Sequence, residues 1–196
     1  MNFLAHLYLS GDDPDIQLGN FMGDFVKGRN PQLQFPERVA KGILAHRLID
    51  QFTDAHPLVR QSKDRIRGNY RHYSGVIVDI YYDHFLARQW AEHHPVPLQE
   101  FAQGVYRMVK GREEIVPERA MNMLPWMVKG DWLTSYAHVE GIRRVLTGMS
   151  RRTPYASGME RAADDLIEHY DGLEAEFNQF LPEVRHASRE FLSFAP

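Results

Sequence analysis

The segment VIVDIYYDHFLARQWAEHH, residues 76–94, decides the fold class. Its first seven residues are rich in β-branched and aromatic side chains, which favour strands. However, Ile77, Tyr81 and Phe85 continue to Arg88 at spacings of three and four residues, and such spacing defines one face of a helix. The pattern also runs well past the usual length of a strand. We therefore predict a long helix that ends before Pro95.

The same helical spacing recurs along most of the chain. It covers an N-terminal segment around His6 and then residues 15–26, 36–57, 57–71, 98–116, 117–128, 133–146, 159–180 and 182–194. Prolines and glycines separate several of these segments, as helix start and stop signals do, and no alternating strands with turn dipeptides occur. The sequence predicts an all-α helical bundle of about eight to ten helices, forming a single domain over residues 1–196.

Composition excludes several classes of site. The 196 residues include no cysteine, which excludes disulfide frameworks, thiolate-bound zinc, iron–sulfur clusters and thiol catalysis. The formal net charge of −3 disfavours binding of nucleic acid through bulk positive charge. No apolar run approaches the roughly 20 residues of a membrane helix, and the first residues make a poor signal peptide. We expect a cytoplasmic protein that binds neither nucleic acid nor membranes; its oligomeric state is not indicated.

The segment HRLIDQFTDAH, residues 46–56, combines histidine and carboxylates in apolar sequence. His46, Asp50 and Asp54 follow one another at intervals of four residues, so they share one helix face. Imidazole nitrogen and carboxylate oxygen, without sulfur, suit Mn²⁺, Fe²⁺, Mg²⁺ or Zn²⁺. A metal ion held there would lower the pKa of a bound water and polarise a phosphoryl oxygen. The alternative is a plain hydrogen bond between His46 and Asp50.

Three other segments add acids or histidine to this pattern. Asp79 and Asp83 are also four residues apart in apolar sequence, where like charges repel and burial is costly, so we expect an arginine or a metal ion to offset them. Asp24 lies in FMGDFVKG and His6 in NFLAHLYLS. Helical bundles build metal sites from several helices in this way. Taken singly, each residue also fits a purely structural role, such as a core histidine, a surface ion pair or a solvent-facing acid.

Basic residues form a second pattern. Those that step by three and four residues along one predicted helix are Arg60, Lys63, Arg67 and Arg71. This basic stripe fits either a solvated face paired with acids such as Asp64, or a docking surface for an acidic partner or a phosphate. Lys27 and Arg47 lie close in sequence to the acidic residues and are candidates to hold a substrate phosphate.

Four blocks in the first half of the chain, NFLAHLYLS, GNFMGDFVKG, HRLIDQFTD and VIVDIYYDHFLARQW, resemble the acyl carrier protein phosphodiesterase family. In the second half VLTGMSRR and HYDGLEAEFNQF are also similar, so the resemblance covers essentially the whole chain. The family is a distant relative of the all-helical His-Asp metal phosphohydrolases, whose fold the resemblance implies. The His-Asp dipeptide itself is absent here; His46 with Asp50, and the reversed Asp83-His84, stand in its place.

The resemblance implies hydrolysis of holo-acyl carrier protein to the apo form, with release of 4′-phosphopantetheine. It also implies a divalent metal ion, typically Mn²⁺, with Mg²⁺ or Fe²⁺ as alternatives, and it marks Asp24 as essential. We expect the metal ligands and their supporting residues among His6, Asp24, His46, Asp50, Asp79 and Asp83.

The same resemblance suggests roles for other residues. His84 or His72 is a candidate general acid for the leaving serine oxygen, while Lys27 and Arg47 would hold the phosphate. Acyl carrier protein is strongly acidic, so the basic stripe is a candidate docking face. Two other hypotheses stay open: a nucleotide or small-molecule phosphohydrolase of the wider His-Asp class, and a non-enzymatic helical adaptor.

Overall fold

The computed structural model describes residues 1–194 and contains no β-strand among them. Its α-helices are α1 (Phe3–Leu9), α2 (Pro14–Phe21), α3 (Glu37–Ala55), α4 (Pro57–Tyr70), α5 (Ser74–Arg88), α6 (Trp90–His93), α7 (Leu98–Lys110), α8 (Glu118–Lys129), α9 (Trp132–Ser135), α10 (Val139–Ser150), α11 (Ala162–Glu168) and α12 (Tyr170–Ser193). Four short 3₁₀ helices join them: η1 (Gly23–Phe25), η2 (Pro31–Leu33), η3 (Arg71–Tyr73) and η4 (Met159–Arg161). The all-α prediction is confirmed, and the likeness to the His-Asp phosphohydrolase fold stays a prediction.

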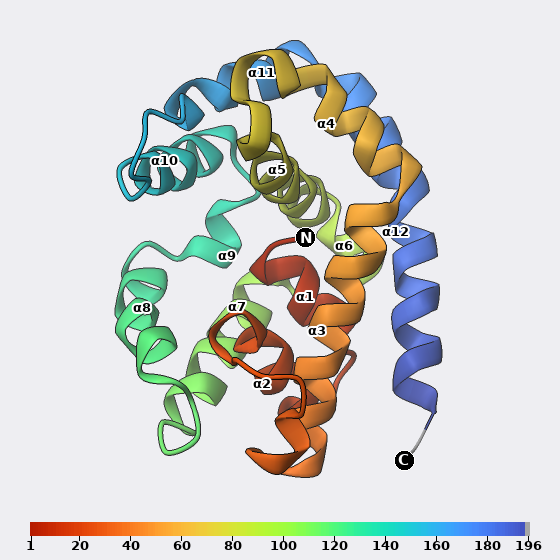
Figure 1. Ribbon diagram of the computed structural model, residues 1–196, viewed down its shortest axis with the longest axis vertical. Helices are drawn as coiled ribbons and strands as arrows, with labels where there is room; N and C mark the ends of the chain where they lie inside the picture. Colours follow the sequence, from red (N-terminus) through yellow and green to blue (C-terminus); the bar gives the residue numbers. More distant parts are fainter. Residues whose placement is uncertain (195–196) are drawn as a thin grey trace.

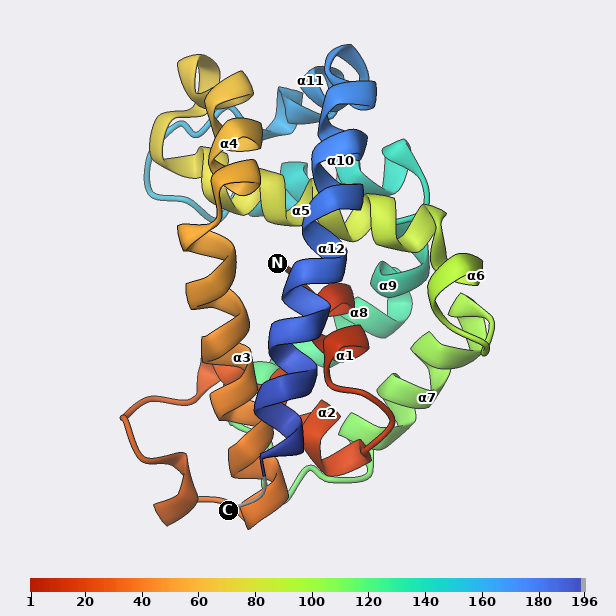
Figure 2. The ribbon, with the colours of Figure 1, turned by 90° about the vertical axis from the view of Figure 1, so that its right-hand side faces the viewer.

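Helix α12 runs along much of the molecule and packs against α3, α4 and α5 (Figure 2). Helices α7 to α10 lie on the opposite side of the molecule from α12 (Figure 1). The short α1 lies between these groups and contacts α2, α5 and α12. Buried apolar side chains from Met1 to Val184 form one connected core. Within residues 1–194, no helix combines the length and the apolar character needed to span a membrane.

Helices α2 and α3 approach each other through two glycines. A Cβ atom on Gly19 would lie 2.0 Å from the main-chain oxygen of Val39, and one on Gly42 would lie 2.2 Å from that of Ile16. No larger residue fits at either position, because Cβ would meet rigid backbone. This close contact packs α2 against the first turns of α3, about one turn before His46.

The structure corrects several predicted helix boundaries. The segment 159–180 begins with η4 and breaks at His169, between α11 and α12, and the segment 98–116 ends as a helix at Lys110. The segment from residue 76 breaks at Gln89 into α5 and α6, and the segment 133–146 consists of α9 and α10, separated where His138 is extended. The helix predicted to reach Val26 ends at Phe21. Conversely, Pro182 does not start a new helix but lies inside α12. An interior proline removes one helical hydrogen bond, and α12 continues because Leu181 and Val184 are anchored in the core.

Candidate metal centre

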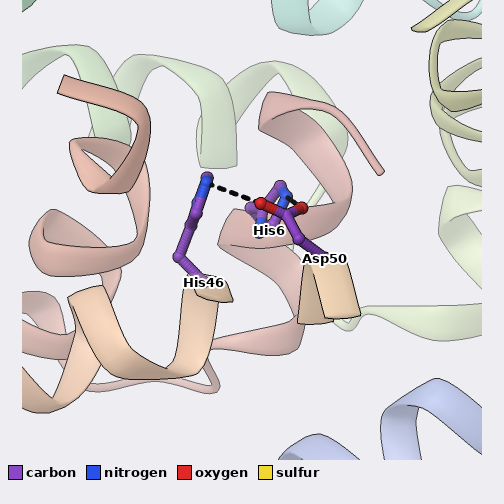
Figure 3. A group of neighbouring side chains, drawn as sticks. All are labelled: His6, His46 and Asp50. Carbon is purple, nitrogen blue, oxygen red and sulfur yellow. Dashed lines mark ion pairs between the residues drawn. The ribbon is translucent and has the colours of Figure 1, made fainter. Parts of the chain in front are cut away.

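Three side chains from two helices converge on one point. His46 and Asp50 lie one turn apart on α3, and His6 comes from α1 (Figure 3). Nε2 of His6 lies 3.1 Å from Oδ1 of Asp50, and Nε2 of His46 lies 3.2 Å from Oδ2 of the same residue. The two imidazole rings stack with centroids 4.0 Å apart. These ligand atoms all lie within 4.8 Å of one another, which is close enough to share one cation.

Asp24 joins this group from the tight turn η1. Its Oδ1 lies 3.2 Å from Nε2 of His46, and its side chain is 67% exposed. The turn reaches the ring because its first residue is Gly23, where a Cβ atom would lie 2.3 Å from Cγ of His46. Because α2 ends at Phe21, the single 3₁₀ turn η1 carries Asp24 over the ring of His46.

Asn20, which sequence analysis did not single out, orients both histidines. Its main-chain oxygen is 2.9 Å from Nδ1 of His46, and its Oδ1 is 2.9 Å from Nδ1 of His6. The amide nitrogen of Asn20 donates to Ser10 Oγ, which in turn donates to the main-chain oxygen of His6. Carbonyl oxygens only accept hydrogen bonds, so both histidines carry a proton on Nδ1. The sequence offered one indication of this role: Asn20 lies four residues before Asp24, within the same block GNFMGDFVKG.

The pKa shifts follow from this arrangement. Burial lowers the pKa of His6. Burial alone would also lower the pKa of His46, but the adjacent carboxylates of Asp24 and Asp50 outweigh it and raise the pKa to about 9. Burial works against ionisation of Asp50, yet hydrogen bonds from His46 and His6 hold its pKa well below the usual range. The hydrogen bond from His46 lowers the pKa of Asp24 as well.

The donor set fits a divalent metal ion. Each ring keeps its proton on Nδ1, so a metal ion that displaces the proton from Nε2 would find the Nε2 lone pair directed toward the shared site, as a metal ligand requires. Both oxygens of Asp50 face an imidazole nitrogen, Oδ1 at 3.1 Å from Nε2 of His6 and Oδ2 at 3.2 Å from Nε2 of His46. His6, His46 and Asp50, with Asp24 beside them, therefore form a nitrogen and oxygen donor set of the kind that binds Mn²⁺, Fe²⁺ or Zn²⁺.

Asp79 and Asp83 both hold the first residues of the chain, but in different ways. Oδ1 of Asp79 lies 2.9 Å from the amino group of Met1. Asp83 is fully buried and accepts hydrogen bonds from the main-chain nitrogens of Asn2, Leu4 and Ala5. Burial raises the pKa of Asp83 to about 7. Asp83 thus supports the start of α1, the helix that carries His6, and lies apart from the group of His6, His46 and Asp50.

A polar cavity of about 300 Å³ opens beside the metal centre. The acids that line it come from η1, α3 and α5 and are Asp24, Asp50, Asp54 and Asp79. Thr53, Val76 and the first two residues complete the wall. The structure therefore brings Asp79 into the same cavity as Asp24 and Asp50.

Comparisons with known proteins identify the family of this chain. The model of the family "Acyl carrier protein phosphodiesterase" matches residues 1–184. The chain belongs to this family. Acyl carrier protein phosphodiesterase from Enterobacter sp. (strain 638) is 38% identical over 185 residues, covering 94% of this chain and 95% of the relative. The protein of that name from Escherichia coli O6:H1 is 38% identical over 194 residues, covering 98% and 100%. No solved structure was found to match the chain.

The two histidines expected as general acids of this phosphodiesterase family member lie away from the polar cavity. His84 is buried, with Nδ1 2.7 Å from the main-chain oxygen of Tyr136 and Nε2 3.1 Å from the hydroxyl of Tyr170. Burial lowers its pKa to about 4, so the ring is neutral at pH 7. His72 is exposed and packs against Tyr73. Neither lines the cavity among the described residues.

Lys27 and Arg47, the predicted phosphate-binding residues, differ in their surroundings. Lys27 is exposed. Arg47 donates to the main-chain oxygens of Val26 and Arg29 at 3.3 and 3.4 Å, so it holds the segment that follows Asp24. Neither lines the polar cavity among the residues that the structure describes.

The basic stripe lies on α4 and the first residue of η3, as its spacing predicted. Lys63 reaches Asp54, at 2.8 Å, on the cavity wall, and Arg67 pairs with Asp64 at 3.0 Å. Arg60 and Arg71 are exposed. The stripe is thus partly neutralised, and Lys63 contacts a residue of the cavity wall.

Proposed function

We propose that this protein is a metal-dependent phosphodiesterase that hydrolyses holo-acyl carrier protein to apo-acyl carrier protein and 4′-phosphopantetheine. The observation that carries the proposal is the convergence of His6, His46, Asp50 and Asp24 beside a carboxylate-lined cavity. Membership in the acyl carrier protein phosphodiesterase family supports the substrate. The name of the relatives indicates the class of substrate, and the donor set of the site indicates metal-dependent hydrolysis.

Charge explains why a metal ion is needed. Of the four carboxylates that line the cavity, Asp79 pairs with the amino group of Met1 and Asp54 pairs with Lys63. Asp24 and Asp50 carry two negative charges against the single charge of a protonated His46, so they would repel a phosphodiester anion that enters the cavity. A bound divalent ion neutralises the phosphate oxygens and makes water a nucleophile at neutral pH. His6, His46 and Asp50 would hold that ion, with Asp24 as the further donor. Asp24 is the most exposed member of this group, with 67% of its side chain exposed against 42% for Asp50, so we place it nearest the substrate.

The donor set favours Mn²⁺ or Fe²⁺ over Mg²⁺, because two imidazoles are poor ligands for Mg²⁺. We propose Mn²⁺ as the working ion, as the family resemblance implies. For the general acid, the geometry favours neither His84 nor His72, since neither lines the cavity among the described residues. The cytoplasmic location stays a prediction.

We propose the basic stripe on α4 as the docking face for the acidic carrier protein. Lys63 supports this because it bridges α4 to Asp54 on the cavity wall. A carrier protein seated on α4 would therefore present its modified serine at the cavity. Exposed Arg60 and Arg71 would meet its acids, an attraction that salt weakens.

The direct test is to incubate holo-acyl carrier protein with the protein and Mn²⁺ and to measure the mass of the product. Loss of the phosphopantetheine mass supports the proposal, and an unchanged mass with metal-loaded, folded protein refutes it. Release of phosphate from nucleotides without any protein substrate would instead favour a nucleotide phosphohydrolase. Absence of stoichiometric metal in protein purified without chelator would favour the adaptor.

Asp24→Ala should lower the rate of phosphopantetheine release by about a hundredfold or more, since even supporting residues of metal sites are worth 10–100-fold. The matched control is Asp12→Ala, which removes an exposed acid outside the polar cavity and should leave the rate unchanged. Equal activity of both variants would remove Asp24 from the mechanism.

A further inference from the structure

A second, apolar cavity of about 490 Å³ adjoins the carboxylate cavity. Asn2, Asp24 and Val76 line both, so the two cavities meet at these residues. Phe3 and Phe25 form the apolar wall on the α1 and η1 side. The volume lies within the range of small-molecule sites, roughly 300–1,000 Å³. A ligand that binds Asp24 can therefore extend from a polar into an apolar compartment.

The far wall of the apolar cavity is adaptable. Met123 of α8, Met149 of α10 and Met159 of η4 line it, and methionine side chains fill irregular space because they are unbranched and flexible. Two arginines, Arg119 and Arg152, add hydrogen-bond donors to this lining. The combination suits a long, flexible and mostly apolar ligand that carries a few carbonyl oxygens.

We propose that this apolar cavity binds the pantetheine arm of the substrate during hydrolysis. The inference rests on the proposed function. A phosphodiester has two substituents, and the carrier protein is far too large for the cavity, so the arm must be the one that enters. Its dimethyl carbon lies one methylene from the phosphate ester oxygen and would meet Val76, at the junction, and Phe25 on the apolar side. Its amide carbonyls, further along, would accept hydrogen bonds from Arg119 and Arg152.

The first experiment uses free pantetheine, which lacks the phosphate, and protein with ¹³C-labelled methionine methyl groups. Pantetheine should shift the resonances of Met123, Met149 and Met159. The methyl groups of Met108 and Met127, which do not line the cavity among the described residues, should not move. Shifts that spare the three cavity methionines would overturn the inference.

The second experiment fills the cavity. Met123→Trp should lower kcat/KM for holo-acyl carrier protein about tenfold more than it lowers kcat/KM for bis(p-nitrophenyl) phosphate, a small diester with no arm. Met121→Trp is the matched control, because Met121 is also half-buried on α8 but does not line this cavity among the described residues. The control should leave the ratio of the two kcat/KM values unchanged.

The outcomes separate the two proposals. If the wild-type protein does not cleave holo-acyl carrier protein with Mn²⁺, the proposed function fails, whatever the variants do. If the wild type cleaves it while Met123→Trp and Met121→Trp give the same ratio, the function stands and the arm binds elsewhere. A selective loss in Met123→Trp supports the cavity as the arm site.

Discussion

At the scale of single residues, Asn20 decides which nitrogen each histidine offers to a metal ion. Its two oxygens, one from the side chain and one from the main chain, each accept a hydrogen bond from Nδ1 of a different histidine. Asn20 is fully buried, and Ser10 fixes the orientation of its amide. Metal sites depend on such supporting residues because a ring that can turn or change tautomer is a weaker ligand.

Asn20→Ala should weaken Mn²⁺ binding by about 10- to 100-fold. The variant removes the acceptor for His6 but keeps the main-chain acceptor for His46, so one of the two imidazole ligands loses its constraint. The dissociation constant for Mn²⁺, measured by electron paramagnetic resonance, checks this. Asn20→Asp keeps an oxygen acceptor and should recover part of the affinity. If Asn20→Ala and the wild type have equal dissociation constants for Mn²⁺, Asn20 has no role in orienting His6.

His84 carries a prediction about stability and pH. Its pKa is lowered from 6.5 to about 4, with burial as the largest cause. Below pH 6.5, His84 is therefore protonated in the unfolded chain but still neutral in the folded protein. The free energy of unfolding should fall by about 2 kcal/mol between pH 7.5 and pH 5 from this residue alone, and the loss should continue down to about pH 4.

Urea unfolding of the wild type and of His84→Gln at pH 7.5 and pH 5 measures this contribution. Groups that titrate in both proteins cancel, so the difference between the two free energies isolates His84. The wild type should lose stability relative to the variant as pH falls. A difference that does not depend on pH would mean that the folded protein accepts the proton as readily as the unfolded chain.

The limits of sequence reasoning are visible in two pairs of acids and histidines. His46 and Asp50 were predictable, because a spacing of four on one helix fixes their distance whatever the rest of the fold. Asp79 and Asp83 have the same spacing, yet one lines the polar cavity and the other binds the main chain of α1. Whether Asp79 or Asp83 lines the cavity or binds the main chain of α1 depends on how α1 crosses α5. No local sequence pattern predicts that crossing.

At the scale of elements, the turn η1 is shaped by the ring that it covers. Gly23 has room for hydrogen but not for a methyl group against His46. Gly23→Ala should push the turn and the ring apart, at a cost of about 1–3 kcal/mol for overpacking, and should lower phosphopantetheine release by about tenfold or more.

Gly104→Ala is the control for that substitution. Gly104 lies in α7, and a Cβ atom there would meet nothing within 4 Å. Alanine should raise stability slightly through helix propensity, by up to about 1 kcal/mol, without changing the rate. Thermal melts and release assays on both variants check the pair; a fully active Gly23→Ala protein would show that the turn adapts at no cost.

Helix existence was easier to predict than helix ends. The spans of α3 and α4 follow from strong periodicity bounded by Pro36 and Pro57. The break at Gln89 and the passage of α12 through Pro182 do not, because tertiary packing outweighs local stop signals there. The end of α2 at Phe21 also depends on tertiary packing, since Gly23 contacts His46, which lies 23 residues further along the chain.

At the scale of the whole molecule, the metal centre joins segments that are distant in the chain. His6 belongs to α1, Asp24 to η1, and His46 and Asp50 to α3. In the unfolded chain these donors are apart, so a metal ion binds the folded form preferentially. Binding to the folded state alone stabilises it, by about 2.7 kcal/mol at a metal concentration 100 times the dissociation constant.

For a chain of this size, each kcal/mol raises the melting temperature by about 2–4 °C, so saturating Mn²⁺ should raise Tm by about 5–10 °C over protein in chelator. Asp50→Asn is the discriminating control, because Asp50 contacts both histidines and loss of its charge should abolish most of the rise in Tm. A rise of equal size in the variant would place the ion elsewhere. No rise in the wild type, at Mn²⁺ concentrations that saturate activity, would mean that the donors converge without binding metal, and the charge argument for catalysis would then need a different cation.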